Sequence, residues 1–383
     1  MKNNKQLKNG HNRITSLKQT AVAVALSSVA SVASADIVIG STDTTTLSMF
    51  GLLDIGVLYQ DHYDAANGET VGIESNGLTP SVIGFKGVRE LPGNTNAFFN
   101  LESHFAFNNG EFIGGEKLFR RQANLGLTGD WGTVIAGRQY GPALLAQLGT
   151  EPRGYKEQFS QVFTLVYSTI PGGASGAGDA ANENNDVGIF FSDAIQYRNS
   201  INGFDFGLMY SAAGTAENSD GDVVAVGLAY NNGPLTLSTS YQSMDDDVTG
   251  EEVIKNWSLG AAYNFGDITV KANYLATENK DDDGSMLVDL ESLGVGLDWR
   301  WDPRNTATVA YYNNEAKGEG DVNTLVLSND YKLDSQTTVY AQLAHVDADN
   351  VGDDAQFATS VVATPTPADQ KTTLINVGFN IAF

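Results

Sequence analysis

Polar and apolar side chains alternate with a period of two residues along most of the chain after residue 45. In the run 256–265, Trp257, Leu259 and Tyr263 alternate with small or polar residues, and the run 235–242 repeats the pattern. Such alternation predicts strands rather than helices. We count sixteen strand-like runs of about ten residues, which begin near Thr46, Ser81, Thr95, Leu118, Thr133, Val187, Gly203, Val223, Leu235, Val253, Ile268, Asp289, Thr306, Val322, Thr337 and Thr372.

The stretch 117–139 shows the repeating unit and its one exception. Two strand-like runs flank the turn Gly129–Gly132, which predicts a β-hairpin. From Tyr140 to Asp186 the alternation of strands and short turns then stops for about 45 residues, a length far greater than that of an ordinary connection between strands. The sequence therefore predicts one anomalous loop, residues 140–186, on a regular scaffold.

The remaining connections alternate between short and long. One set consists of tight turns such as 91–94, 231–234 and 302–305, and the other of longer, often acidic segments such as 60–80, 108–116, 212–221 and 347–370. Short turns at one rim and long loops at the other are typical of a bacterial outer-membrane barrel. The predicted fold is therefore all-β, a transmembrane 16-stranded antiparallel barrel, which is wide enough for a water-filled lumen.

A soluble sandwich would show the same alternation with its apolar face inward, but two further patterns favour the membrane. Aromatic residues gather beside the short turns, as in a girdle at the water–lipid boundary: Trp131, Phe204, Phe206, Tyr230, Phe265, Trp299, Trp301 and Tyr331. The chain also ends on Phe383, at the end of an amphipathic strand, and this resembles the assembly signal of outer-membrane barrels.

The N-terminus predicts export. Residues 1–19 carry five basic residues and no acid, an apolar run follows, and Ala33-Ser34-Ala35 precedes Asp36. This is the pattern of a secretory signal peptide, and the apolar run is too short for a spanning helix of about 20 residues. We therefore expect residues 1–35 to be removed and residues 36–383 to form the barrel.

The amino-acid composition excludes several classes of function. Loss of the leader takes the formal charge from -24 to about -29, so we expect no binding to nucleic acid. The chain has no cysteine and, after the leader, only His62, His104 and His345, which leaves little for zinc sites or thiol nucleophiles. We expect no cofactor, no metal and no enzymatic activity.

Several motifs in the first half carry a family resemblance. The segments 50–57 (FGLLDIGV), 83–87 (IGFKG), 101–103 (LES), 121–123 (RQA) and 137–140 (GRQY) resemble, in order and spacing, the signatures of the trimeric general porins of Gram-negative outer membranes. The resemblance implies a homotrimer in contact with outer-membrane lipids and lipopolysaccharide. It also implies that the third long loop, here 140–186, folds into the lumen as an eyelet through which small hydrophilic solutes and ions diffuse.

In that family, loop acids face basic residues across the eyelet and create a transverse field that sorts ions. The loop acids are Glu151, Glu157, Asp179, Glu183 and Asp186, of which Glu151 and Glu157 are the better candidates. Candidates on the pore wall are Lys86, Arg121 and Glu102 by resemblance, together with Arg198 and Lys271 by alternation alone.

Two residues bear on assembly and selectivity. Arg138 suits either the pore or a bond across the trimer interface. Val82 stands where the family commonly has a further arginine, which makes the basic wall thinner. From this and from the acidic loops we infer a preference for cations.

Three alternatives stay open. Phe159, Phe163 and Tyr167 have helical spacing and could form an aromatic slide of a sugar-selective or other nutrient-selective porin, although such a stripe more often packs a loop against its wall. A barrel lipase would need cooperating Ser and His, and Ser103 and His104 point to opposite strand faces. A receptor is the third alternative. The acidic clusters 245–247, 281–283 and 347–354 are best explained as solvated loops.

Overall fold

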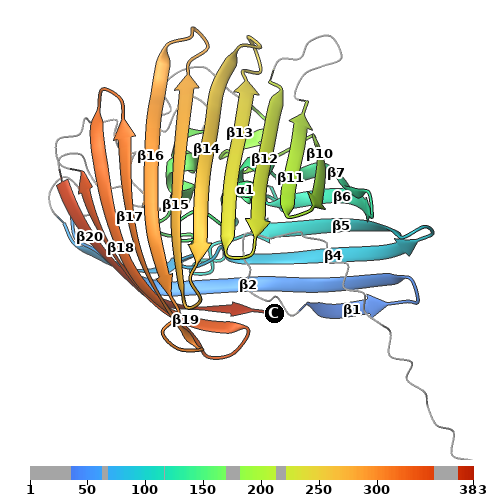
Figure 1. Cartoon of the computed structure of the whole chain (residues 1–383), viewed down its shortest axis with the longest axis horizontal. Helices are drawn as coiled ribbons and strands as arrows, with labels where there is room; N and C mark the ends of the chain where they lie inside the picture. The colour runs from blue at the N-terminus through green and yellow to red at the C-terminus, as the bar shows by residue number, and fades with distance from the viewer. Residues whose placement is uncertain (1–35, 63–67, 116, 170–181, 213–220, 349–369) are drawn as a thin grey trace, which may run out of the picture.

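The computed structural model describes residues 36–62, 68–115, 117–169, 182–212, 221–348 and 370–383. Its dominant feature is a ring of hydrogen-bonded antiparallel strands (Figure 1). From β4 to β7 and from β10 to β20 each strand pairs with the next along the chain, β2 pairs with β4 and with β20, and β7 pairs with β10 across the long third loop. Because this last pairing joins the first and last strands, the barrel closes without a free edge.

Sixteen strands form the wall, as the sequence predicts. They are β2 (Thr45–Gln60), β4 (Val82–Leu91), β5 (Thr95–His104), β6 (Gln122–Gly129), β7 (Gly132–Tyr140), β10 (Ala194–Ile201), β11 (Phe204–Ser211), β12 (Val223–Asn232), β13 (Leu235–Asp245), β14 (Glu252–Asn264), β15 (Ile268–Lys280), β16 (Met286–Trp299), β17 (Asn305–Ala316), β18 (Gly320–Lys332), β19 (Thr337–Ala348) and β20 (Gln370–Ala382).

Two predicted strand starts are displaced. The strand expected near Val187 begins at Ala194, because the short strands β8 (Asn185–Asp186) and β9 (Phe190–Phe191) first pair beside the end of β7. The strand expected near Leu118 begins at Gln122. Residues 120 and 121 therefore precede the strand and are free of its alternation, which is what lets Arg121 turn into the lumen.

Two further strands were not expected. β1 (Ile37–Ser41) pairs with the first half of β2, on the edge that β20 occupies along its second half. β3 (Thr70–Ser75) lies within the connection 60–80 that we interpreted as a loop, and it pairs with the second half of β2. The long strand β2 is thus hydrogen-bonded along both edges for most of its length.

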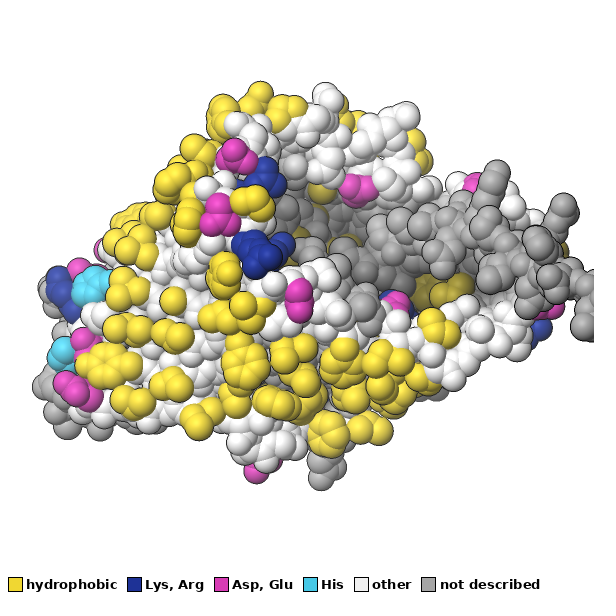
Figure 2. All heavy atoms as spheres, turned by 90° about the horizontal axis from the view of Figure 1, so that it is seen from below, with side chains coloured by type: hydrophobic (Ala, Val, Ile, Leu, Met, Phe, Trp, Pro, Cys, Tyr) yellow, Lys and Arg dark blue, Asp and Glu magenta, His cyan; other side chains and the backbone are white. Residues whose placement is uncertain are grey.

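The apolar face of the wall points outward, as the sequence predicts for a membrane barrel. Ile375, Val377 and Phe379 of β20 are 41–50% exposed, whereas Asn376 and Asn380, which alternate with them, are fully buried. Figure 2 shows hydrophobic side chains spread widely over one outer face, with charged side chains confined to a few places. The expected aromatic girdle is exposed at Trp131, Phe204, Phe265, Trp299, Trp301 and Tyr331.

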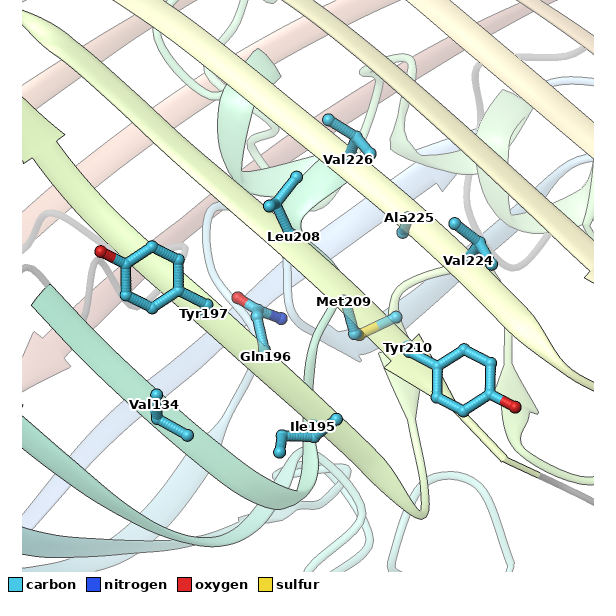
Figure 3. A pocket seen from close by; sticks show the side chains of 10 residues that line it. All are labelled: Val134, Ile195, Gln196, Tyr197, Leu208, Met209, Tyr210, Val224, Ala225 and Val226. Atoms are coloured by element: carbon cyan, nitrogen blue, oxygen red, sulfur yellow. The ribbon is translucent and has the colours of Figure 1, made fainter.

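The outer surface is not uniformly flat. A groove of about 390 Å³ crosses β7, β10, β11 and β12, as the close view in Figure 3 shows. Its side chains include the exposed residues Ile195, Leu208 and Val224, flanked by Tyr197 and Tyr210. An apolar groove of this kind is compatible with the hydrocarbon region of a bilayer.

The two helices belong to the third loop. α1 (Pro142–Gln147) begins with proline at its first helical position, where the missing N–H costs no hydrogen bond, and α2 (Val162–Ser168) follows later in the loop. α1 contacts β11, β12, β13 and β14 and lies behind them in Figure 1. No helix in the described ranges is long and apolar enough to cross a bilayer.

One buried carboxylate holds the bend between β3 and β4. The side chain of Asp54 accepts hydrogen bonds from the backbone N–H groups of Gly77, Leu78 and Thr79 at 2.8–3.1 Å, and from the Tyr340 hydroxyl at 2.8 Å. These N–H groups have left the β ladder and would otherwise be unsatisfied. Asp54 thereby fixes the segment 76–81 to the inside of the wall.

We expect Asp54→Asn to destabilise the barrel, because the new amide N–H₂ would face backbone donors. The loss of a charged acceptor from three N–H groups should lower the free energy of unfolding by about 2–3 kcal/mol. Urea unfolding of the reconstituted protein, followed by tryptophan fluorescence, measures this change. Asp43→Asn, at an exposed turn position, is the matched control. Equal stability of the two variants would contradict the role of Asp54.

Candidate functional site: the loop inside the barrel

The third loop lies against the inner wall along a row of glycines. Gly207 and Gly227 face Pro142, Gly260 faces Thr150, and Gly294 and Gly296 face Pro152. A Cβ atom at Gly227 would come within 2.0 Å of the Pro142 carbonyl oxygen, and one at Gly294 within 2.8 Å of the Pro152 ring. Since these wall positions have no side chain, the loop backbone can approach the strands closely.

Hydrogen bonds continue this contact around the barrel. Gln147 bonds Ser240 of β13 at 3.1 Å, Gln161 bonds Ser292 of β16 at 2.9 Å, and Arg153 bonds Gln342 of β19 at 2.7 Å. Gln158 also accepts a bond from Asn376 of β20. The described part of the loop therefore crosses the lumen side of the wall from β11 to β20.

Glu151 is the centre of the loop's own fold. Its carboxylate is fully buried and accepts hydrogen bonds from the backbone N–H groups of Arg153, Tyr155 and Gln161, and from the Tyr312 hydroxyl at 2.8 Å. Both oxygens are occupied and neither faces open lumen. Glu151, one of our two better candidates for a constriction acid, is therefore placed as an anchor of the loop, and we do not retain it as a charge that ions meet.

Opposite the loop, three arginines surround one aromatic ring. The guanidinium carbons of Arg120, Arg121 and Arg138 lie 6.0, 5.2 and 5.9 Å from the centre of the Phe190 ring. Each guanidinium contacts the ring within the range of a cation–π interaction. Phe190 sits in β9 and thus brings the returning end of the loop to the three arginines.

Each arginine of this group also has an acidic partner in the same chain. Arg121 Nε bonds Glu102 Oε1 at 2.6 Å, and the Tyr140 hydroxyl contacts both residues. Arg120 bonds Asp186 at 2.8 Å, and Arg138 bonds the other oxygen of the same carboxylate. Burial alone would raise the pKa of Asp186, but its hydrogen bond to Arg120 and the charges of Arg120 and Arg138 outweigh it, so the pKa lies below its ordinary value.

Glu157 faces this arginine group across a cavity of about 410 Å³, which Arg120, Arg121, Tyr140 and Phe190 also line. The Glu157 backbone N–H bonds the carbonyl of Leu78, which sets the acid beside the bend that Asp54 holds. Burial raises the pKa of Glu157, and the charge of Arg121 counteracts part of this. Of the sequence candidates, the structure thus brings Glu157, Arg121 and Glu102 together, with Arg138 behind Phe190.

The other candidates lie elsewhere. Lys86 bonds Asp36 at 2.5 Å and Lys271 bonds Asp298 at 2.8 Å, both on the inner wall and outside the cavity. Glu183 is exposed and its backbone N–H bonds Asp247. Arg198 lines a second cavity on the other side of the loop. Asp179 lies outside the described residues.

The aromatic stripe is not formed as expected. Phe159 precedes α2 and is fully buried in a cluster with Leu58, Leu290 and Tyr312, so it packs the loop against the wall. The side chains of Phe163 and Tyr167 lie outside the described residues. Phe159 therefore lies outside α2 and packs the loop against the wall, which is the alternative that we favoured for these aromatic residues.

Several functional contacts were missed at the sequence level. Asp54, Arg153 and Tyr312 were not identified, because each has a partner far away in the sequence, namely Tyr340, Gln342 and Glu151 respectively. The row of wall glycines did leave a signal, since Gly207, Gly227, Gly260, Gly294 and Gly296 all occupy inward positions of their strands. Glycines repeated at inward positions of consecutive strands could have indicated where the loop docks.

A closed antiparallel barrel with an apolar exterior, a polar inner wall and a long loop packed inside it defines a channel-forming protein of the bacterial outer membrane. Residues 20–351 match the family model described as Gram-negative porin. The chain belongs to this family, whose members are channels and not enzymes, and its place is the outer membrane.

Among known proteins, the chain is 26% identical over 352 residues to outer membrane porin protein 32 of Delftia acidovorans, covering 88% of this chain and 94% of that one. Among solved structures it resembles the anion-selective porin from Comamonas acidovorans, with a TM-score of 0.74, 24% identity, and coverage of 88% of this chain and 100% of the other. Salmonella typhi OmpF gives a TM-score of 0.62 at 16% identity, covering 90% and 100% of the two chains.

The close contact at Gly227 yields a prediction. In Gly227→Ala the new Cβ meets the Pro142 backbone, so α1 must move off the wall toward the open lumen. We expect a barrel that folds normally with a lower single-channel conductance, measured in a planar bilayer.

Gly40→Ala is the control, since nothing lies within 4 Å of its added Cβ. Wild-type conductance in a well-folded Gly227→Ala barrel would show that the position of α1 does not limit the current.

Proposed function

We propose that this porin forms a water-filled pore for passive diffusion of small hydrophilic solutes and ions, narrowed between the third loop and β5–β7. The observation that carries the proposal is the position of Glu157, which faces Arg120 and Arg121 across one cavity. Opposite charges fixed on two sides of a narrow passage produce a transverse field, which orders water and admits hydrated solutes.

We further propose a weak preference for cations, from the charge balance of this passage. Arg120, Arg121 and Arg138 are each ion-paired with Glu102 or Asp186. Glu157 and Glu74 also line the cavity, and neither has an ion pair within the described residues. Four carboxylates against three guanidinium groups leave an excess of one negative charge.

A second candidate function is passage of anions. It is favoured by the name of one structural relative, the anion-selective porin from Comamonas acidovorans. The charges of our own chain favour the opposite sign, because Glu102, Asp186, Glu74 and Glu157 outnumber the three arginines around Phe190. A sugar-selective or other nutrient-selective pore, the third candidate, loses the support of Phe159, which is buried in a wall cluster.

For assembly we propose a homotrimer in contact with outer-membrane lipids and lipopolysaccharide, after export and removal of residues 1–35. The start of β1 at Ile37, directly after the expected cleavage site, supports this boundary. Arg138, a candidate for a bond between subunits, already has Asp186 of its own chain as its partner. We therefore propose that Arg138 holds the end of the third loop through Asp186 and does not form a bond between subunits.

Electrical recording tests the proposed pore. The mature protein in a planar bilayer should give ohmic steps that close in threes, and a potassium chloride gradient should give a small reversal potential of cation sign. A reversal potential of anion sign would contradict the proposed cation preference, but the proposed pore function would still stand. An inserted but silent protein would overturn the pore itself.

Glu157 should make this selectivity depend on pH. Because its pKa is raised, the carboxylate takes up a proton at a higher pH than an ordinary glutamate, so one negative charge disappears as the pH falls. A unit charge about 4 Å from an ion contributes about 1 kcal/mol in water, so the permeability ratio of cation to anion should fall several-fold.

In Glu157→Gln we expect a lower ratio and a smaller pH dependence, and what remains would come from Glu74, whose pKa burial also raises. Glu183→Gln, at an exposed rim position, is the control and should keep the wild-type profile. A pH profile in Glu157→Gln that matches the wild type would assign the titration to another group.

A further inference from the structure

A second lumen cavity lies on the other side of the third loop. It measures about 570 Å³ and is bounded by the loop residues Pro142, Leu145, Ala146 and Leu148. The opposite lining comes from the wall strands β6, β7 and β10–β13, close to the short turns 130–132 and 231–234. A solute that passes the arginine group around Phe190 would enter this space next.

Arg198 projects into this cavity as a cation without an acidic partner. Its guanidinium bonds the carbonyl oxygen of Tyr140 at 3.1 Å and the side-chain oxygen of Gln196. Among the described residues no carboxylate oxygen lies within 4.0 Å of it. It differs in this from Arg120, Arg121 and Arg138, each of which is ion-paired with Glu102 or Asp186.

The partners of Arg198 also hold it in place. Two neutral acceptors on one side of the guanidinium fix its plane and leave donors available for a ligand, because an arginine has five N–H donors. A fixed, desolvated guanidinium recognises planar carboxylates through two parallel hydrogen bonds. Tyr140 is the last residue of β7, so the same bond ties Arg198 to the chain just before α1.

The other residues that line the cavity indicate what kind of ligand would fit beside its carboxylate. Leu145, Leu148 and Pro142 form an apolar side, while Thr128, Thr133 and Thr236 offer hydroxyl groups on the wall. Asp130 and Asp205 lie toward the short turns, and each is hydrogen-bonded to an asparagine, Asn94 and Asn231 respectively. Their charges repel an anion at that end and favour its carboxylate at Arg198.

We propose that Arg198 and this cavity form a binding subsite for small monocarboxylates with an apolar body, on the short-turn side of the constriction. The proposal rests on the pore function proposed above. It names a class of solute that would bind briefly at this subsite while it diffuses through the pore. A solute of this class meets the apolar underside of the loop with its body and Arg198 with its carboxylate.

The test uses benzoate and its neutral analogue benzamide, added on the short-turn side of a channel that conducts potassium chloride. Benzoate should interrupt the current of the wild-type channel, whereas benzamide at the same concentration should not. In Arg198→Gln the apparent affinity for benzoate should fall at least tenfold, and Arg198→Lys should recover part of it. Arg89→Gln removes an exposed positive charge outside the cavity and should bind benzoate as the wild type does.

Each outcome decides between the two proposals. A normal potassium chloride current without benzoate block, or equal block in Arg198→Gln, overturns the subsite and leaves the pore function intact. A silent wild-type channel overturns the proposed pore function before the subsite is reached.

Discussion

The structure depends on satisfying backbone hydrogen-bonding groups wherever the chain leaves the β ladder inside a membrane protein. In the wall, neighbouring strands do this, and closure between β2 and β20 leaves no edge. Inside the lumen the same need is met by two buried carboxylates. Asp54 and Glu151 each accept three backbone N–H groups and one tyrosine hydroxyl. An ionised carboxylate suits this role because its two oxygens accept several hydrogen bonds and donate none.

These two anchors determine the shape of the passage. Asp54 fixes the bend 76–81, and the carbonyls of Gly77 and Leu78 in that bend accept the N–H groups of Gln158 and Glu157. Glu151 holds the loop segment 153–161, which contains the two residues bonded to that bend. The loop is therefore held against the strands β11–β20 and is joined to the bend on one side only. The cavity between Glu157 and the arginines around Phe190 is the constriction that we propose.

Much of the fold could be predicted from the sequence, because strand alternation and turn residues are local signals. All sixteen wall strands were found this way, and the outward face of β20 follows directly from Ile375, Val377 and Phe379. The candidate functional site was harder to predict from the sequence. Glu151 and Glu157 are six residues apart in one acidic loop, and nothing local distinguishes the buried anchor from the lumen-lining charge. The difference arises from Tyr312 and from three backbone N–H groups whose orientation exists only after the loop has docked.

The charge of the whole chain is a poor guide to what ions meet in the lumen. Many acids lie in the long loops, where solvent ions screen them over about 8 Å at physiological salt. In the lumen several basic residues are matched one to one, as in Lys86 with Asp36, Lys156 with Asp330 and Lys271 with Asp298. Two of the groups that have no ion pair within the described residues, Glu157 and Arg198, lie on opposite sides of the loop. Cations and anions would therefore be favoured at successive points of one path, which makes overall selectivity weak even in so acidic a protein.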